Sequence, residues 1–213
     1  MNKSTSDMLI VRVEEKVAKV SNFNLLPPEV NVKNISGPGS NPMRTAVAAW
    51  DDLARELANA AAQWKFQLQA TDAWFRGPAA RKFVAAADLY NRWLNTHIET
   101  ATEIAMYLNK AAYAYDIAVH SMAPTASIVA NRSSAWTLKA TNLLGQFTTK
   151  IMELDQAYQE MWVQNAEAMN QYQYTIFDIM ARVEESRISP APEVILDSRG
   201  RVGGFDNSEE ILI

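Results

Sequence analysis

The stretch from Met43 to Ser189 is almost free of the two residues that break helices. The chain has 213 residues with 7 glycines and 8 prolines, but this stretch contains just Gly77, Pro78, Pro124 and Gly145. Most other positions hold Ala, Leu, Met, Gln, Glu or Lys and similar residues, many of which have high helix propensity. The sequence therefore predicts an all-α fold in which these four residues separate long helices.

Between these breaks, apolar residues recur at steps of three and four, which is the spacing of an amphipathic helix. The Asn-Pro pair at 41–42 is a typical helix start, and 143–147 reads as the last break. We expect four long helices, which run from 43 to 71 or 72, from 79 to 122, from Pro124 to 141 or 142, and from the last break to about 189.

Gly77 and Pro78 separate the first two of these helices. Glycine takes a positive φ after a helix without strain, and proline is tolerated in the first turn of the next helix. We therefore expect a helical hairpin at this point. At 1.5 Å per residue the second helix is about 65 Å long, which predicts an elongated bundle of long antiparallel helices.

The first two helices carry more large apolar side chains than the shorter segments can cover. Burying one aromatic side chain contributes on the order of 2–3 kcal/mol, so leaving several of them in water is costly. The residues concerned are Trp50, Trp64, Phe66, Tyr90 and Trp93. The need to bury these side chains therefore predicts obligate association with a partner. A second pair of helices packed on them would meet this need.

Composition argues against several classes of function. The chain has no cysteine, and its two histidines, His97 and His120, lie too far apart on one helix to share a metal ion. A net charge of −4 argues against binding to nucleic acid. No window approaches a membrane span, and the apolar run Met8–Val13 is too short for a secretory signal. Acidic pairs such as Asp51–Asp52 are typical of a solvated helix surface. We therefore expect that the chain is not an enzyme and binds no cofactor, metal ion or small-molecule substrate.

Two short motifs precede the first long helix. Pro27-Pro28-Glu29 is typical of a helix start, with proline in the first turn and Glu29 near the positive helix end. The loop Gly37-Pro38-Gly39-Ser40 lacks the Gly-Lys-Ser/Thr ending of a phosphate-binding loop. From the residues alone, both motifs read as structural turns.

The order of these motifs resembles the N-terminal domain of the mycobacterial PPE proteins, above all the short members that contain little beyond this domain. The resemblance extends from about Asn22 to Glu185. Its residues are Pro27-Pro28-Glu29-Val30-Asn31, Gly37-Pro38-Gly39-Ser40, Ala48-Ala49-Trp50, Asp72-Ala73-Trp74, Asn131-Arg132, Leu144-Gly145-Gln146-Phe147, Leu154-Asp155-Gln156, Tyr158, Trp162 and Tyr172.

The resemblance implies a non-enzymatic, all-helical protein that forms an elongated heterodimer with a PE protein, which is itself a helical hairpin. It further implies export by a type VII (ESX) secretion system. The PE hairpin is then expected on the first two long helices, with Trp50, Leu53, Leu57, Trp64, Phe83, Tyr90 and Leu94 as contacts. The residues alone leave open whether these side chains face Tyr158, Trp162 and Tyr172 of the last helix instead.

Trp74 and Gly77 match the WxG signature that, in the family, lies beside a YxxxD/E export signal of the PE partner. Here two residues, Phe75 and Arg76, stand between Trp and Gly where the pattern has one. One extra residue at a helix end rotates Trp74 by about 100° around the axis. The geometry of a composite signal is therefore altered.

The last break holds three large apolar residues in five positions, Leu143-Leu144-Gly145-Gln146-Phe147. Exposed apolar clusters usually mark a binding surface, whereas the alternative is a hydrophobic cap buried between two helices. The resemblance implies that this tip docks a cytosolic EspG-type chaperone until export.

We divide the chain into an N-terminal extension (1–21), a helical domain (22–189) and a flexible C-terminal tail (190–213). The resemblance implies a secreted or cell-surface protein that is cytoplasmic with its chaperone before export. The alternative function is a self-associating helical structural protein, such as a homodimeric bundle or a phage component, with a similar fold.

Overall fold

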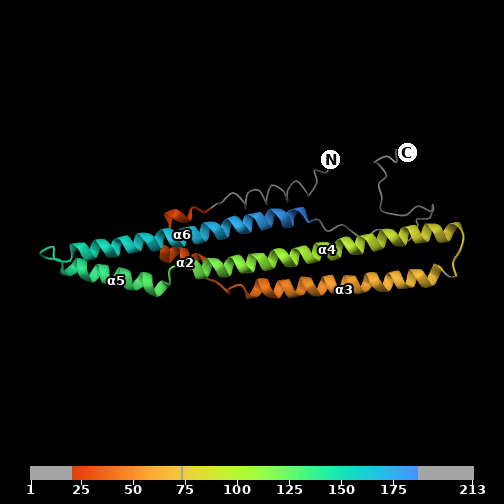
Figure 1. The fold of residues 1–213 in the computed structure, drawn as a ribbon, viewed down its shortest axis with the longest axis horizontal. Helices are drawn as coiled ribbons and strands as arrows, with labels where there is room; N and C mark the ends of the chain where they lie inside the picture. Colours follow the sequence, from red (N-terminus) through yellow and green to blue (C-terminus); the bar gives the residue numbers. More distant parts are fainter. Residues whose placement is uncertain (1–20, 73, 187–213) are drawn as a thin grey trace, which may run out of the picture. The chain divides into compact units, whose positions relative to one another are not determined.

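A computed structural model describes residues 21–72 and 74–186. Throughout these residues the regular structure is helical, and no strand occurs among them. The elements are the 3₁₀ helix η1 (Phe23–Leu25) and the helices α2 (Pro28–Ile35), α3 (Asn41–Asp72), α4 (Pro78–Ser121), α5 (Thr125–Thr141) and α6 (Thr148–Glu185) (Figure 1). The predicted all-α fold of long helices is therefore confirmed.

The breaks between the helices lie where the sequence predicts them. α3 begins at Asn41 and ends at Asp72, and α4 follows from Pro78 to Ser121. Gly77 has φ 108°, so the predicted positive φ is confirmed, and only glycine takes this value without strain. Pro124 is the N-cap of α5. The prediction that the last helix continues to about Ser189 is wrong, because α6 ends at Glu185 and Ser186 is no longer helical. The N-terminal extension to residue 20 and the tail at 190–213 lie outside the described residues.

The chain divides into two compact units, and each is described by itself. The first comprises residues 1–37 and 115–174, and the second comprises 38–114 and 175–213. α4 and α6 each run through both units. The proposed domain boundaries at 22 and 189 stay a prediction.

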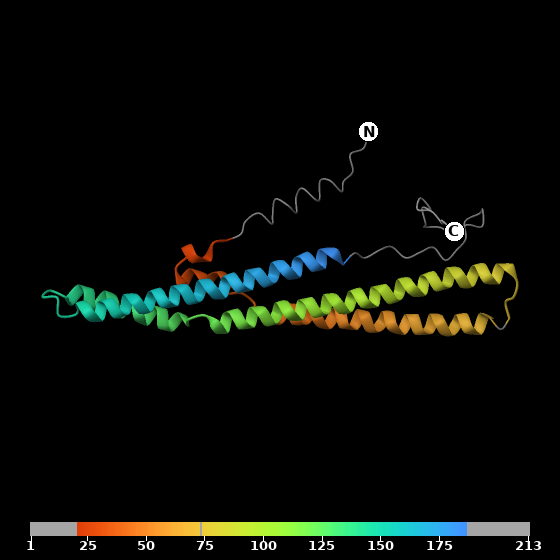
Figure 2. The ribbon, with the colours of Figure 1, turned by 45° about the horizontal axis from the view of Figure 1, so that its top comes forward.

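In the first unit, η1 and α2 pack on the end of α4 and the middle of α6. The core residues are Phe23, Ile35, Ala118, Met122, Ala166, Ala168 and Met169, with Leu26, Val32, Tyr115 and Tyr172 packed against them. Beyond this core, α5 and the first half of α6 lie side by side and are joined by the loop 142–147 (Figures 1 and 2).

A buried asparagine joins three segments of the first unit. The Asn165 side chain is fully buried. Its Oδ1 accepts a hydrogen bond from the Ala123 backbone N–H at 2.7 Å, and its Nδ2 donates to the Pro28 carbonyl at 3.1 Å. Because buried backbone groups need partners, Asn165 fixes α6 against both the α4–α5 break and the start of α2.

In the second unit, α3 and the first part of α4 form the predicted hairpin and lie side by side in both views (Figures 1 and 2). The Trp64 indole N–H donates to the Ala87 carbonyl at 3.1 Å, and the Trp64 and Tyr90 rings meet edge to face at 5.2 Å. Near the turn, Phe75 and Phe83 make a similar contact at 6.2 Å. Aromatic side chains therefore hold the two helices together.

Candidate protein-interaction surfaces

The α5–α6 loop is shaped by polar side chains. The Asn142 Oδ1 accepts from the Phe147 backbone N–H at 2.8 Å. The Gln146 Oε1 accepts from the Leu144 N–H at 3.0 Å, and its Nε2 donates to the Thr141 carbonyl at 3.2 Å. Gly145 takes φ 77°. The loop is thus closed by hydrogen bonds.

The two leucines of this loop project into solvent. Leu143 is 88% exposed and Leu144 is 92% exposed, whereas Phe147 is half buried. Since a buried cap would cover these side chains, the alternative of a self-satisfied hydrophobic cap does not fit. We call residues 143–147 the tip surface.

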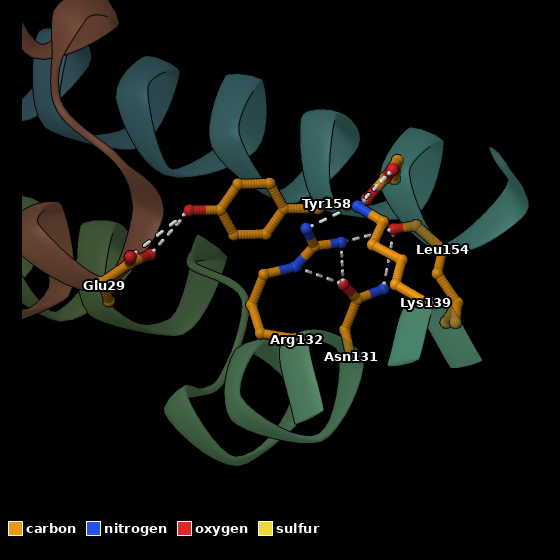
Figure 3. A network of polar contacts seen from close by, with 7 residues as sticks. Glu29, Asn131, Arg132, Lys139, Leu154 and Tyr158 are labelled. Carbon is orange, nitrogen blue, oxygen red and sulfur yellow. Dashed lines mark hydrogen bonds and ion pairs between the residues drawn. The ribbon is translucent and has the colours of Figure 1, made fainter. Parts of the chain in front are cut away.

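A polar network joins α5, α6 and α2 below the tip (Figure 3). The Arg132 guanidinium donates to the Leu154 carbonyl at 3.0 Å and to the Asn131 Oδ1 at 2.6 Å, and it pairs with Asp155 at 3.0 Å. Lys139 pairs with the same carboxylate at 2.9 Å. Hydrogen bonds from Lys139 and then Arg132 hold the pKa of Asp155 below its ordinary value. The network fixes the register of α5 against α6.

The same arginine stacks on Tyr158, and the tyrosine reaches the Pro-Pro-Glu motif. The Arg132 Cζ lies 4.0 Å from the centre of the Tyr158 ring, and the Tyr158 hydroxyl donates to the Glu29 carboxylate at 3.0 Å. Burial and then this hydrogen bond raise the pKa of Tyr158. Cation–π contacts and charge-assisted hydrogen bonds of this kind favour one packing arrangement.

The Pro27–Glu29 motif begins a helix, as predicted. Pro27 is the N-cap of α2, and Pro28 and Glu29 lie in its first turn. Pro28 is fully buried, and Glu29 is bound by Tyr158. The motif therefore anchors α2 to α6, and in this chain its described contacts are internal.

The residues predicted to contact a partner line the seam of the α3–α4 hairpin. Leu94 is buried, Leu53 is exposed, and the others, Trp50, Leu57, Trp64, Phe83 and Tyr90, are half buried. The hairpin thus buries Leu94 and covers the other seam residues only in part. Tyr158 and Trp162 of α6 make other contacts, because they bind Glu29 and the Asn24 carbonyl, and Tyr172 meets Tyr115.

A groove of about 580 Å³ follows this seam. It is lined by Ala60, Gln63, Trp64, Gln67, Tyr90 and Leu94, among others. Across residues 41–71 of α3, Ala61 is the one buried side chain. A helix of this length with one buried side chain is incompletely packed.

His97 lies on the buried side of α4, as its place in the apolar pattern predicts. It is 8% exposed. Its Nδ1 hydrogen-bonds to the Trp93 carbonyl at 2.8 Å, and its ring packs against the Trp93 ring. Its Nε2 is buried without a hydrogen-bond partner among the described residues. The ring therefore acts chiefly as a packing group.

Trp74 and Gly77 lie at the α3–α4 turn, where Trp74 is almost fully exposed. A groove of about 440 Å³ next to it is lined by Phe75, Arg76, Gly77, Ala80, Arg81, Val84, Ala85 and Asp88. Trp74 does not line this groove, whereas both residues between Trp74 and Gly77, Phe75 and Arg76, do. The turn therefore presents an isolated indole beside a basic, partly apolar surface.

The apolar pattern of α5 does not mark a single buried face. Ile128 and Ala135 are buried, but Val129 is 57% exposed and Trp136 is 74% exposed. Leu138 is half buried. The large apolar residues of α5 therefore point both into the fold and into solvent.

Within the described ranges, no group of His, Cys, Asp or Glu could hold a metal ion. In the same residues, no helix is long and apolar enough to cross a membrane.

Comparison with known proteins agrees with this architecture. The model of the PPE family matches residues 22–184. The uncharacterized PPE family protein PPE45 of Mycobacterium bovis is 42% identical over 152 residues, which are 70% of this chain and 37% of that protein. The uncharacterized PPE family protein PPE61 of Mycobacterium tuberculosis is 37% identical over 170 residues, which are 79% of this chain and 41% of that protein.

A third relative has a similar length. The PPE family protein PPE41 of Mycobacterium tuberculosis is 35% identical over 172 residues, which are 79% of this chain and 87% of that protein. The chain thus spans about two fifths of the length of the first two relatives and most of the third. With a family model that covers most of the chain and the helical structure it describes, the chain belongs to the PPE family.

Proposed function

We propose that this chain is a non-enzymatic interaction protein that forms a heterodimer with a PE protein. In this proposal an EspG-type chaperone binds the complex in the cytoplasm, and a type VII (ESX) secretion system exports it to the cell surface or the medium. Family membership supports a role in protein–protein interaction, and the surfaces described above supply places for two partners.

The observation that best supports a heterodimer is the incomplete burial of α3. Of its described side chains Ala61 alone is buried, although Trp50, Leu53, Leu57, Trp64 and Leu68 recur at helical spacing. Each large apolar side chain that moves from water into an interface contributes on the order of 2 kcal/mol. Two helices packed along the α3–α4 groove would complete a four-helix arrangement, in which such side chains are normally buried.

The tip surface is proposed as the chaperone site. Leu143 and Leu144 are held in water by a loop that polar side chains close. Two adjacent exposed leucines on an ordered loop fit a shallow apolar pocket, and burying them requires little ordering of the loop. The tip surface and the α3–α4 seam have no residue in common.

The WxG-like turn is proposed to keep a role in export. Trp74 remains exposed, and the groove beside it adds Arg76 and Arg81 to an apolar lining.

The experiment that tests the proposed function is co-expression of the full chain with mycobacterial PE proteins. We expect the chain to be insoluble or aggregated alone and to be recovered as a soluble 1:1 complex with one PE protein. Leu53→Asp places a charge on the seam and should abolish recovery. The matched control is Leu25→Asp, because Leu25 is exposed in η1 of the other unit.

A soluble homo-oligomer that binds none of the PE proteins would contradict the proposal and support the self-associating alternative. Equal loss of recovery in both variants would show that the effect of Leu53→Asp does not come from the seam. Light scattering coupled to size-exclusion chromatography gives the stoichiometry in each case.

A further inference from the structure

The groove beside the α3–α4 turn, which we call the turn groove, has an excess of positive charge. Its volume is about 440 Å³, and its lining includes two arginines, Arg76 and Arg81, against one carboxylate, Asp88. Both arginines are exposed, and neither forms an ion pair with a carboxylate among the described residues. Two guanidinium groups are therefore available to a ligand in this groove.

Apolar side chains border the two arginines. Phe75 is 41% exposed and Val84 is 36% exposed, and both line the turn groove together with two alanines. A guanidinium binds a carboxylate through two parallel hydrogen bonds, and the apolar lining favours the burial of aliphatic side chains. The turn groove thus suits a short peptide in which acidic and aliphatic residues are adjacent.

A peptide of this kind occurs in the same chain, at residues 204–213, which lie outside the described residues and which we call the acidic stretch. It contains three acidic residues and no basic residue, and Glu209 and Glu210 are followed directly by the aliphatic residues 211–213. Residues 1–20 contain four basic and three acidic residues, so their net charge has the same sign as that of the groove. Charge complementarity therefore favours the acidic stretch as the occupant.

The end of α6 lies on the same side of the second unit as the middle of α4. Two contacts show that α6 runs antiparallel to α4 here: Asp178 pairs with Lys110 at 3.2 Å, and Arg182 interacts with Tyr107. α6 ends at Glu185, which is seven residues beyond Asp178, so this end lies near residue 103 of α4. From residue 103 to Val84 the distance along the helix axis is about 29 Å, at 1.5 Å per residue.

The length of the chain after α6 matches this distance. From Ser186 to Glu209 the chain advances by 23 residues. A flexible chain of that length has a root-mean-square end-to-end distance of about 24–29 Å. A segment that spans its r.m.s. length gives its end the highest effective concentration, which is in the millimolar range. The acidic stretch therefore reaches the turn groove without being extended.

We propose that the acidic stretch docks in the turn groove of its own chain. Its two glutamates then pair with Arg76 and Arg81, and its aliphatic end packs on Phe75 and Val84. The exposed Trp74 indole lies at the same turn, so a protein that binds this turn has to displace the acidic stretch first. The contact is autoinhibitory, and it involves residues of this chain alone.

The test locates the acidic stretch by crosslinking in the full chain, either alone or in its soluble complex. The chain has no cysteine, so Leu212→Cys is combined with Val84→Cys in the groove or with the matched control Met106→Cys. A short bis-maleimide then joins the two thiols. Each rate is divided by the rate at which the single cysteine on α4 reacts with a monofunctional maleimide.

The control position separates docking from free diffusion of the segment. Met106 is more exposed than Val84, at 56% against 36%, and it lies closer to the end of α6. An undocked segment therefore crosslinks to position 106 at least as fast as to position 84. Docking makes the normalised rate at position 84 at least about tenfold higher than at position 106.

A charge swap tests the ion pairs. Arg76→Glu together with Arg81→Glu should abolish the preference for position 84, because the groove then repels the acidic stretch. Adding Glu209→Lys and Glu210→Lys should restore it. Equal thermal unfolding midpoints show that the exposed substitutions leave the fold intact.

Each outcome decides the inference. Preferential crosslinking at position 84 that is lost with the acidic groove and regained with the swap supports it. Equal normalised rates at positions 84 and 106, or a preference that survives the acidic groove, overturns it. Crosslinks between two chains instead of within one assign the groove to a second copy and also overturn it. These results do not depend on which PE protein or chaperone binds, so co-expression tests the proposed function separately.

Discussion

Leu144→Asp places a carboxylate at the centre of the proposed chaperone site with little effect on folding. The side chain is almost entirely in water, and the loop is closed by the Gln146 and Asn142 side chains, which the substitution leaves in place. Substitutions at exposed positions usually change stability by less than about 0.5 kcal/mol. Phe147 is less suitable, because it is half buried at the start of α6.

The magnitude follows from the exposure of the side chain. Full burial of a leucine contributes about 1.5–3 kcal/mol, and some nine tenths of that remains available at Leu144. Losing about 2 kcal/mol of contact energy weakens binding roughly 30-fold, since 1.4 kcal/mol is a factor of ten. The cost of removing a carboxylate from water adds to this loss. We therefore expect at least about a 30-fold increase in Kd.

Calorimetry of the heterodimer with the chaperone measures this change directly. Leu25→Asp carries the same substitution at another exposed position and should bind as the unaltered chain does. Equal thermal unfolding midpoints for the two variants would show that both are folded. A change in Kd of less than about threefold for Leu144→Asp is under 1 kcal/mol, and it would refute the view that the tip leucines are buried by the chaperone.

Three further predictions concern the contacts that support these surfaces. Asn165→Ala removes the buried acceptor of the Ala123 N–H and a second hydrogen bond, so the free energy of unfolding of the heterodimer, measured in urea, should fall by about 2–4 kcal/mol. The pKa of Asp155 in the folded state is lowered, so its ion pairs stabilise the fold above the ordinary carboxyl pKa. This stabilisation is lost as the pH falls through the lowered pKa. In a pH series of thermal unfolding, Asp155→Asn should lack the part of the acid destabilisation that comes from this carboxyl. Trp64→Phe replaces the indole with a smaller aromatic ring and loses the hydrogen bond to Ala87, so urea unfolding of the heterodimer should show a loss of at least about 1 kcal/mol.

Helix boundaries could be predicted because they depend on local chemistry. Gly77 is needed for a positive φ, and Pro78 and Pro124 lack the backbone donor that a helix interior requires. These effects act within a few residues of the chain, so one sequence is enough to place them. The start of α2 at Pro28 follows from the same rules.

Contacts between distant segments could not be predicted in this way. The link between Glu29 and Tyr158 joins residues 129 positions apart, and nothing in the local pattern of either segment indicates the other. Periodicity identifies apolar residues on a helix but not their partners, so it does not show that Trp136 of α5 faces solvent. Likewise, the spacing of Trp50, Leu57 and Trp64 predicts which face of α3 packs on another helix. It does not predict how much of each side chain α4 buries.

The most direct test of the central claim is the accessibility of the α3–α4 groove in the heterodimer. The chain has no cysteine, so single cysteines can be introduced as Gln63→Cys in the groove and Thr137→Cys on α5. Both positions are exposed in the chain by itself. In the purified complex with the PE partner, the cysteine at 63 should react with a maleimide much more slowly than the cysteine at 137, and both should react alike after unfolding in guanidinium. Equal reaction rates at the two positions in the folded complex would contradict the claim that a partner hairpin covers this groove.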